Sequence, residues 1–486
     1  MYVHFDPMNV ICKYGLWLIL FTGVLCAGCR EESIEEDEEA PENTQKLNGF
    51  IKEVMSNIYL WYDKLPSIDI RYETDSKAYF YKLLYSEDKW SYITDDITAF
   101  ENSLEGIEKT YGYALAFGRF LDATGNFTGN YFAIVEYVYP NSPAFRAGLN
   151  RGDLITRINN VSITESNYKE LYYSTSVTLT KGTYTTSGIA TDGTLSMTAE
   201  ELNLDPVLMY KVIQKEGHRI GYLVYLQYIT SYDDTSLKTA LQYFRDNQIT
   251  DLILDLRYNP GGQTAAAQYL CSSLAPLNTV NNGSTLVSFQ WNEKYQSYWT
   301  SKNNQSQLGV KFNSSVPVKL GLSKLTVLTG DNTASASELT ICGLEPYMDV
   351  TLVGDTTYGK YTASTTIKPE DWYDKESEYS SFKNWGLQPI IIRFANANGV
   401  TNFKNGFTPN YLVDDALLPA YPLGDLTEPL LKKAVEHITG VQIAALKKAE
   451  APFRFEIFDH GSSRFDNQKR NLFLEKDVLK MKNSNR

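Results

Sequence analysis

Histidine is scarce in this chain. The 486 residues include only four, at positions 4, 218, 437 and 460, and none adjoins a serine at a predicted strand-to-helix junction. The GxSxG pentapeptide, a common turn around a hydrolase serine, does not occur. A Ser-His-Asp hydrolase is therefore disfavoured, whereas a serine activated by a lysine remains open.

Cysteine is also rare, with five residues. Cys12, Cys26 and Cys29 fall near the N-terminus, and Cys271 and Cys342 stand far apart in apolar surroundings. The last two are expected to be separate buried thiols. The sequence has no HExxH and no paired CxxC, so we expect no metal and no other cofactor.

Positive charge is in deficit, because 45 Lys and Arg face 58 Asp and Glu, a net charge of −13. An acidic chain binds polyanions poorly, so nucleic acid is not expected as a partner. Hydrophobic residues make up 43% and charged residues 21%, which excludes wholesale disorder. At about 150 residues per domain, the length predicts about three domains.

Long apolar runs are absent, since the run Gly15–Leu25 is too short to cross a bilayer core of about 30 Å. It predicts a secretion signal over residues 1–29. The following Cys26-Ala27-Gly28-Cys29 resembles a bacterial lipobox, which implies lipidation of Cys29, although Cys26 holds the place where leucine is usual. The alternative is a signal peptide that is simply removed.

Residues 30–44 are predicted to be an acidic tether, because residues 30–43 hold eight acidic side chains and almost no apolar ones. An acidic run after the lipidated cysteine resembles the surface-export signal of Bacteroidetes lipoproteins. We therefore expect a lipid-anchored protein of the cell envelope, periplasmic or on the outer-membrane surface.

The body divides into four segments by pattern. Residues 45–100 show apolar positions at intervals of three and four, which predicts a small helical N-terminal domain. Residues 101–204 are rich in strand and turn signals, residues 205–440 alternate strands and helices, and residues 441–486 form a C-terminal extension. The extension carries ten Lys and Arg and six Asp and Glu, and is expected either to pack as an appendage or to be mobile.

Within the second segment, Ser142–Thr164 (SPAFRAGLNRGDLITRINNVSIT) contains a short helix, a glycine turn, a strand and an Asn-Asn hairpin turn. This pattern resembles a PDZ domain of the bacterial protease type, which binds peptides by strand addition. The resemblance places the peptide carboxylate at Tyr111, Gly112, Tyr113 and Ala114. A PDZ fold acting only as a spacer or gate is the alternative.

The third segment predicts an α/β fold. Apolar strands are expected over 220–225, 251–257, 324–329 and 350–354, with helices over 235–247 and from about residue 334. Continuous apolar strands between helices predict a sheet covered on both faces.

Ser335 is the strongest nucleophile candidate. It follows the strand KLTVLTG and opens an apolar helix, where free amides and the helix dipole favour developing negative charge. Three Ser-x-x-Lys spellings, at Ser86, Ser166 and Ser380, lie among polar neighbours that would keep their lysines protonated.

Four further motifs accompany TASASE (333–338): LVGDTTYGK (352–360), DLRYNPGG (255–262), GFTPN (406–410) and the closing helix LGDLTEPLLKKAVEHI (423–438). Together they resemble the C-terminal processing (tail-specific) serine peptidases. The resemblance implies a crotonase-like (ClpP/crotonase) α/β peptidase core, a PDZ domain and a small N-terminal helical domain.

The same resemblance implies roles for individual residues. Ser335 would be the nucleophile and Lys360 its base, with an oxyanion hole from the amides of Ala336 and of Gly262 or Gly261. The family usually has glutamine four residues after the lysine, where it orients the amine, and here Ser364 holds that place.

A lysine can serve as base only when neutral, which needs a pKa about 3 units below the usual 10.4, obtained by desolvation or nearby positive charge. Partial burial of Lys360 at a strand end is expected. Two other motif residues have simpler interpretations: Asp255 and Arg257 as a local ion pair, and Glu338 as a dipole partner in the first helical turn.

The sequence thus predicts a serine endopeptidase with a Ser-Lys dyad, acting on protein or peptide substrates whose C-termini the PDZ domain recognises. One alternative is a weak or inactive peptide-binding lipoprotein on the same fold, which Ser364 favours. A second is a crotonase-type acyl-CoA enzyme, which has no use for a PDZ domain. The sequence makes no prediction of oligomeric state.

Overall fold

The computed structural model describes residues 38–122, 124–185, 188–444, 454–461 and 472–474. The predicted signal, Cys29 and most of the predicted tether lie outside these residues. Helix α1 begins at Glu42, inside the range predicted for the tether. Among the described residues, no helix is long and apolar enough to cross a membrane.

The N-terminal segment is helical, as its periodicity predicts. Its elements are α1 (Glu42–Ile58), η1 (Tyr62–Lys64), η2 (Ile70–Tyr72), α2 (Ser76–Lys82), β1 (Tyr92–Thr94) and α3 (Ile97–Leu104). Leu47, Ile51, Val54 and Ile58 form the buried stripe of α1. The side chain of Asp75 caps α2 by accepting hydrogen bonds from two backbone amides of its first turn.

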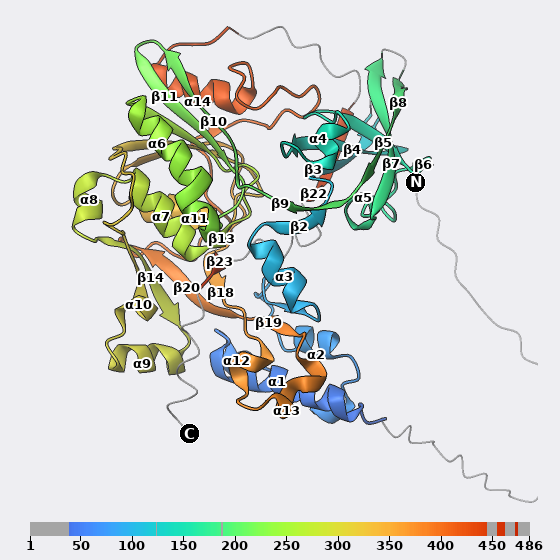
Figure 1. Ribbon diagram of the computed structural model, residues 1–486, viewed down its shortest axis with the longest axis vertical. Helices are drawn as coiled ribbons and strands as arrows, with labels where there is room; N and C mark the ends of the chain where they lie inside the picture. Colours follow the sequence, from blue (N-terminus) through green and yellow to red (C-terminus); the bar gives the residue numbers. More distant parts are fainter. Residues whose placement is uncertain (1–37, 123, 186–187, 445–453, 462–471, 475–486) are drawn as a thin grey trace, which may run out of the picture. The chain divides into compact units, whose positions relative to one another are not determined.

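The predicted PDZ segment forms an antiparallel sheet in the order β22-β3-β4-β5-β7-β8, with β6 paired to β5 (Figure 1). The strands are β3 (Tyr113–Leu121), β4 (Phe127–Val138), β5 (Leu154–Ile158), β6 (Val161–Ser162), β7 (Ser176–Thr185), β8 (Gly188–Thr198) and β22 (Arg454–Gly461), with helices α4 (Pro143–Arg146) and α5 (Glu170–Tyr173). Asn159 and Asn160 turn between β5 and β6 with positive φ, which confirms the predicted hairpin. A separate ribbon joins β2 (Ile107–Thr110) to β9 (Glu200–Asn203).

The α/β core contains a six-stranded sheet in the order β10-β11-β12-β16-β17-β21, parallel except for the β10–β11 hairpin. Its strands are β10 (Val207–Lys215), β11 (His218–Tyr225), β12 (Asp251–Asp255), β16 (Lys324–Thr329), β17 (Asp349–Gly354) and β21 (Tyr411–Leu412).

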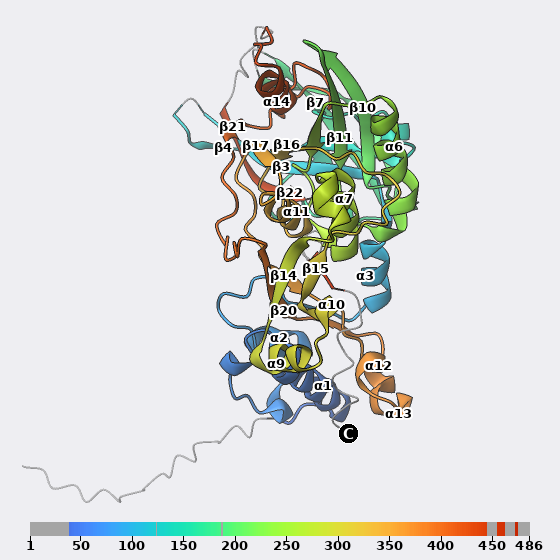
Figure 2. The ribbon, with the colours of Figure 1, turned by 90° about the vertical axis from the view of Figure 1, so that its left-hand side faces the viewer.

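Helices cover both faces of this sheet, as predicted. Successive side chains of each strand point to opposite sides, so each strand packs against helices on both faces. Tyr222 and Val224 of β11 pack with Leu431 of α14 (Pro429–Thr439), whereas Leu223 and Tyr225 join the cluster that includes helix α6 (Lys238–Asp246). Figure 2 shows α14 and α6 on opposite sides of β11.

A second six-stranded sheet follows the order β13-β23-β18-β20-β14-β15. Its strands are β13 (Gly262–Gln263), β14 (Thr285–Trp291), β15 (Gly309–Lys311), β18 (Thr362–Ser364), β20 (Ile390–Asn396) and β23 (Leu472–Phe473), while β19 (Gly386–Gln388) pairs with β1. The other helices of the core are η3 (Thr230–Tyr232), η4 (Asp233–Leu237), α7 (Thr264–Leu274), α8 (Leu277–Asn281), α9 (Glu293–Ser301), α10 (Gln305–Leu308), α11 (Ala336–Leu344), α12 (Pro369–Trp372), α13 (Glu376–Tyr379) and η5 (Ser380–Phe382). The two described strands of the C-terminal extension, β22 and β23, therefore lie in two different sheets.

Candidate active site

Ser335 lies in the turn between β16 and α11, directly before the first helical residue. Its backbone has φ 61° and ψ −109°, a conformation that costs free energy for any residue with a Cβ and that is concentrated at functional sites. The side chain is fully buried, and among the described residues its Oγ has no hydrogen-bond partner. The fold therefore holds a strained serine with an uncommitted hydroxyl at a helix N-terminus.

Glu338 joins the Ser335 turn to the segment that carries Lys360. One oxygen, Oε2, accepts hydrogen bonds from Ser335 N at 2.9 Å and Lys360 N at 2.8 Å. The other, Oε1, accepts from Gly359 N and Thr357 Oγ1, each at 2.6 Å. A single buried carboxylate thus fixes the two candidate catalytic backbones against each other.

The role predicted for Glu338, a helix-dipole partner, accounts for only part of this arrangement. Burial raises the pKa of Glu338 to about 7, although the hydrogen bonds from Thr357, Ser335, Gly359 and Lys360 act in the opposite direction. The sequence analysis did not predict this Glu338 clamp, the carboxylate that accepts hydrogen bonds from both the Ser335 turn and the Lys360 segment. The available signal was a glutamate within an otherwise apolar helix, three residues after a serine.

Lys360 is fully buried, which exceeds the partial burial expected from its place at a strand end. Desolvation lowers the pKa of Lys360 well below its usual value, against the opposing effect of Asp88 and Glu338. Its Nζ lies 5.8 Å from the centre of the Trp90 ring. The N-terminal domain thus supplies an aromatic wall and a carboxylate beside the amine.

The glycine turn of DLRYNPGG abuts the nucleophile. A Cβ added to Gly261 would lie 2.7 Å from Ser335 Cβ and 3.0 Å from Ala336 N, so only glycine fits. Asn259 braces this turn, because its Oδ1 accepts from Gly261 N at 2.9 Å and its Nδ2 donates to Tyr225 O.

The predicted Asp255–Arg257 ion pair is confirmed, with 2.9 Å between Arg257 Nη2 and Asp255 Oδ2. Arg257 also pairs with Glu428, the N-cap residue of α14, at 2.8 Å and with Asp415 at 2.9 Å. The guanidinium therefore ties the closing helix to the strand end that carries the glycine turn.

The GFTPN element packs against the turn that leads to Lys360. Thr357 N donates to Phe407 O at 3.2 Å, and Phe407 N donates to Thr357 Oγ1 at 2.7 Å. Gly359 and Gly406 have positive φ and no room for a Cβ, because backbone oxygens lie within 2.5 Å of that position. The motif thus acts as packing for the Lys360 turn.

Ser364 is buried on β18, and its backbone carbonyl accepts a hydrogen bond from Leu474 N at 3.0 Å. Thr362, two residues nearer to Lys360 and on the same face of the strand, is also buried. Within the described part of the chain, Thr362 Oγ1 has no hydrogen-bond partner. Two buried hydroxyl side chains, those of Thr362 and Ser364, therefore stand on the strand that follows Lys360.

In the PDZ domain, the predicted carboxylate loop, Tyr111–Ala114, runs into β3, which begins at Tyr113. Tyr111 and Tyr113 are buried, their rings stack at 5.5 Å, and their hydroxyls donate to Ser174 O and Leu171 O at 2.7 Å. Gly112 has a φ of 78°, and Ala114 is buried in β3. The two tyrosine side chains therefore hold the domain together, and only the loop backbone could meet a ligand.

Cys271 and Cys342 are both buried and not bonded to each other, as predicted. Burial raises the pKa of each thiol to about 12, so neither is a reactive thiolate. Over the described ranges, no group of three His, Cys, Asp or Glu side chains is placed to hold a metal ion.

The sequence and the fold were compared with those of known proteins. Residues 219–413 match peptidase family S41, residues 46–92 the S41 N-terminal domain and residues 134–180 a PDZ domain. A carboxyl-terminal-processing protease of Synechocystis is 23% identical over 64% of this chain and 66% of its own length. The carboxy-terminal processing protease CtpA of Bacillus subtilis is 25% identical over 57% of this chain and 53% of its own.

The chain therefore spans about half to two thirds of the length of these curated relatives. A crystal structure assigned as an S41 protease of Bacteroides fragilis NCTC 9343 aligns with 28% identity and a TM-score of 0.66, covering 80% of this chain and 97% of that one. The predicted fold class, an α/β peptidase core with a PDZ and an N-terminal domain, is confirmed. The chain therefore carries a domain of peptidase family S41 over residues 219–413, together with an S41 N-terminal domain and a PDZ domain, and its relatives include C-terminal processing proteases.

Proposed function

We propose that this chain is a serine endopeptidase of the C-terminal processing type, with Ser335 as nucleophile and Lys360 as base. One observation carries the proposal. Lys360 is fully buried with a lowered pKa, and its backbone shares one carboxylate oxygen of Glu338 with the backbone of Ser335. A buried lysine with a lowered pKa, whose backbone is held by the same carboxylate as that of a strained serine, suits proton transfer.

The chemistry follows from these groups. Neutral Lys360 takes the proton of the Ser335 hydroxyl while Oγ attacks the peptide carbonyl, and the ammonium then returns that proton to the departing amine. An acyl-enzyme on Ser335 remains, and a water activated by Lys360 hydrolyses it. Desolvation favours the first step because it removes the cost of deprotonating the amine during the reaction.

The oxyanion formed by this attack needs fixed N–H donors. The Ala336 amide stands at the first position of α11, where helical N–H groups lack an intrahelical acceptor. Of the two glycines, Gly261 donates its N–H to Asn259 Oδ1, which supports Gly262 as the second donor.

A serine-reactive fluorophosphonate probe tests the dyad. We expect a single adduct on Ser335, located by mass spectrometry, in wild type and in Ser337→Ala but not in Ser335→Ala. The labelling rate should rise from pH 6 to pH 8. Deprotonated Lys360 is the base, and Glu338, with a pKa of about 7, accepts all four of its hydrogen bonds only when ionised. Absence of an adduct on Ser335 at every pH would contradict the proposal.

Ser364 is proposed to orient the Lys360 amine in place of the family glutamine. Ser364→Ala is expected to lower kcat about 10-fold, the effect of losing one hydrogen bond of roughly 1.4 kcal/mol, with an unchanged thermal midpoint. Thr362→Val is the matched control, because it removes a neighbouring buried hydroxyl at nearly constant volume. A loss in Thr362→Val but not in Ser364→Ala would assign the orienting role to Thr362 instead.

Ser364 also favours a second candidate function, a peptide-binding lipoprotein with weak or no activity, because serine is shorter than the glutamine it replaces. This candidate predicts no adduct on Ser335 and no turnover of an unfolded protein. Recognition of substrate C-termini by the PDZ domain is common to both candidates and rests on strand addition to β3.

A further inference from the structure

The C-terminal extension occupies the peptide-binding edge of the PDZ domain. Strand β22 pairs antiparallel with β3 over its length, from Arg454 opposite Leu121 to Gly461 opposite Leu115 (Figure 1). Its direction carries it toward the loop at Tyr111–Ala114, where a bound peptide would place its carboxylate. The Tyr172 hydroxyl of α5 donates to Gly461 O from the other side. The edge strand and helix that would receive a peptide thus already hold one.

Side-chain contacts show that this pairing is specific. Glu136 of β4 is 1% exposed, and its partner is His460 of the extension, with 2.6 Å between Oε1 and Nδ1. Burial alone would lower the pKa of His460, but the Glu136 carboxylate, with smaller contributions from Asp331 and Asp415, outweighs this effect and raises the pKa to about 9. Removing the extension would take this partner away from the Glu136 carboxylate.

Two further polar contacts lie along the same strand. Tyr168 donates to Asp459 Oδ2 at 2.8 Å, and Arg119 Nε donates to Glu456 Oε2 at 2.8 Å. The extension is also the basic part of an acidic chain, since it holds ten Lys and Arg and six Asp and Glu within a net charge of −13. In the two contacts above, the docked strand supplies the acids Glu456 and Asp459, and the body supplies the donors Arg119 and Tyr168.

The extension then enters the candidate active site. Leu472 pairs in parallel with Gly262, the proposed oxyanion donor, and with Ala363 of β18; Phe473 pairs with Gln263 and Ser364. Leu474 N donates to Ser364 O, and Thr365 Oγ1 donates to Leu474 O, both at 3.0 Å. Strand β23 lies between β13 and β18 in the sheet, so it fills a slot one strand wide between the glycine turn and the strand that follows Lys360.

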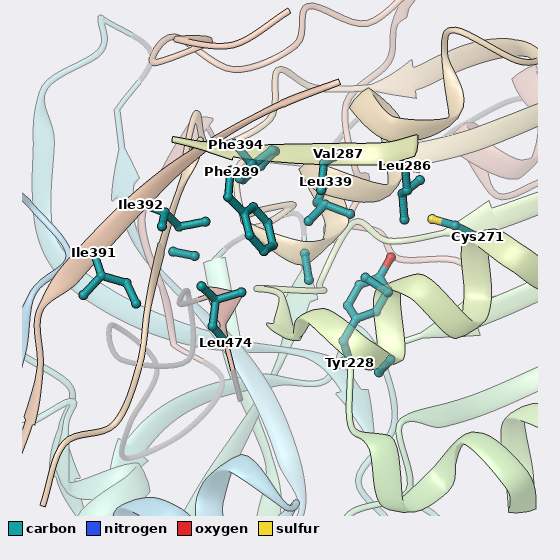
Figure 3. Packing of buried hydrophobic residues seen from close by; sticks show 14 of the residues in the cluster. Tyr228, Cys271, Leu286, Val287, Phe289, Leu339, Ile391, Ile392, Phe394 and Leu474 are labelled. Atoms are coloured by element: carbon teal, nitrogen blue, oxygen red, sulfur yellow. The ribbon is translucent and has the colours of Figure 1, made fainter. Parts of the chain in front are cut away.

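Leu474 anchors this end of the segment. Its side chain is 9% exposed and belongs to the main hydrophobic cluster of the core. Figure 3 shows it among the side chains of that cluster, with Phe289 of β14, Leu339 of α11 and Ile392 of β20. The slot therefore accepts an extended backbone together with an aliphatic side chain.

We propose that the described parts of the extension, residues 454–461 and 472–474, are an intramolecular ligand of this peptidase, which occupies the PDZ groove through β22 and the active-site slot through β23, and so excludes other polypeptides until it is displaced. That the slot beside Gly262 belongs to an active site rests on the proposed function. That β23 fills the slot rests on the strand pairing alone. It also defines the ligand that the slot accepts, an extended peptide with an aliphatic residue at the position of Leu474.

Two truncations test the proposal by activity. A chain ending at Val441 lacks both strands, whereas a chain ending at Leu474 keeps both and is the matched control. The first should cleave an unfolded protein with a kcat/KM at least 10-fold above that of the full chain, and the control should match the full chain. Equal activity of all three chains would overturn the proposal.

Binding separates failure of this proposal from failure of the proposed function. In the Ser335→Ala background, a fluorescein-labelled peptide of residues 454–474 should bind the chain ending at Val441, and neither the full chain nor the control. That result supports the intramolecular ligand even if no chain shows turnover. Equal binding to the full and truncated chains, or to neither, would overturn it.

Leu474→Asp in the full chain tests the same proposal without truncation, so that misfolding of the truncated chain cannot decide the outcome. A carboxylate has no partner in the apolar cluster, so β23 should leave the slot while β22 remains. We expect cleavage to rise severalfold and hydrogen exchange at the β18 amides to accelerate, with exchange at β3 unchanged. Unchanged exchange at β18 would contradict the assigned occupancy of the slot.

Discussion

Replacing Lys360 by methionine is expected to lower kcat/KM for cleavage of an unfolded protein by about 10⁴-fold or more, the usual cost of losing a general base that activates a serine. Ser335→Ala should lose as much, and the double variant no more, since the two groups act as a unit. The assays should also be run in the chain ending at Val441, so that the extension does not mask the activity.

Stability distinguishes this loss of activity from misfolding. Burial lowers the pKa of Lys360, so in the unfolded chain the amine binds a proton that the folded chain rejects. This difference in proton binding destabilises the folded state at neutral pH, and the destabilisation fades as the pH rises toward about 10.4. Lys360→Met should therefore raise the free energy of unfolding at pH 7, by about 0.5–2 kcal/mol, and the gain should shrink in alkaline buffer. A folded, more stable variant that still cleaves would refute the assignment of the base.

Glu338→Gln is expected to be the most damaging single substitution of a residue outside the proposed dyad. Each carboxylate oxygen accepts two hydrogen bonds, so an amide NH₂ in place of either oxygen leaves two buried donors without an acceptor. At about 1–3 kcal/mol for each unsatisfied donor, the free energy of unfolding should fall by about 2–5 kcal/mol. Loss of the shared Oε2 contacts should also move Ser335 and Lys360 apart and lower kcat by about 10²-fold.

Glu345→Gln provides the matched control, because Glu345 stands exposed at the end of the same helix. Its stability, measured by denaturant unfolding, and its kcat should match those of wild type. If Glu338→Gln kept wild-type kcat, the clamp would be ruled out as the device that positions the two residues, and each segment would have to hold its own geometry.

Much of the site could be predicted from the sequence because its residues stand in short motifs. A serine between an apolar strand and an apolar helix, a glycine pair after DLRYN and a lysine after tyrosine and glycine each carry a local signature. The Asn159-Asn160 hairpin was equally local, since asparagine tolerates positive φ. These positions could be predicted from residues adjacent in the sequence, without information on which residues lie near them in the fold.

Contacts across long sequence separations could not be predicted in this way. Lys360 lies in the sequence far from Trp90 and Asp88, two residues that contribute to its surroundings in the fold. Arg257 satisfies the predicted pair with Asp255, but its bond to Glu428 spans 171 positions. No periodicity or motif encodes such a meeting, because it depends on how whole elements pack.

The amino-acid sequence by itself was enough to indicate the family, the order of the segments and the choice of Ser335 and Lys360 as candidates, since each depends on residues adjacent in the chain. Only the tertiary structure decided that Lys360 is fully buried, that one glutamate accepts hydrogen bonds from both backbones, and that the C-terminal extension pairs with β3 through β22 and with Gly262 through β23. The physical reason is that desolvation and strand pairing are properties of surroundings, and those surroundings are assembled from segments hundreds of residues apart.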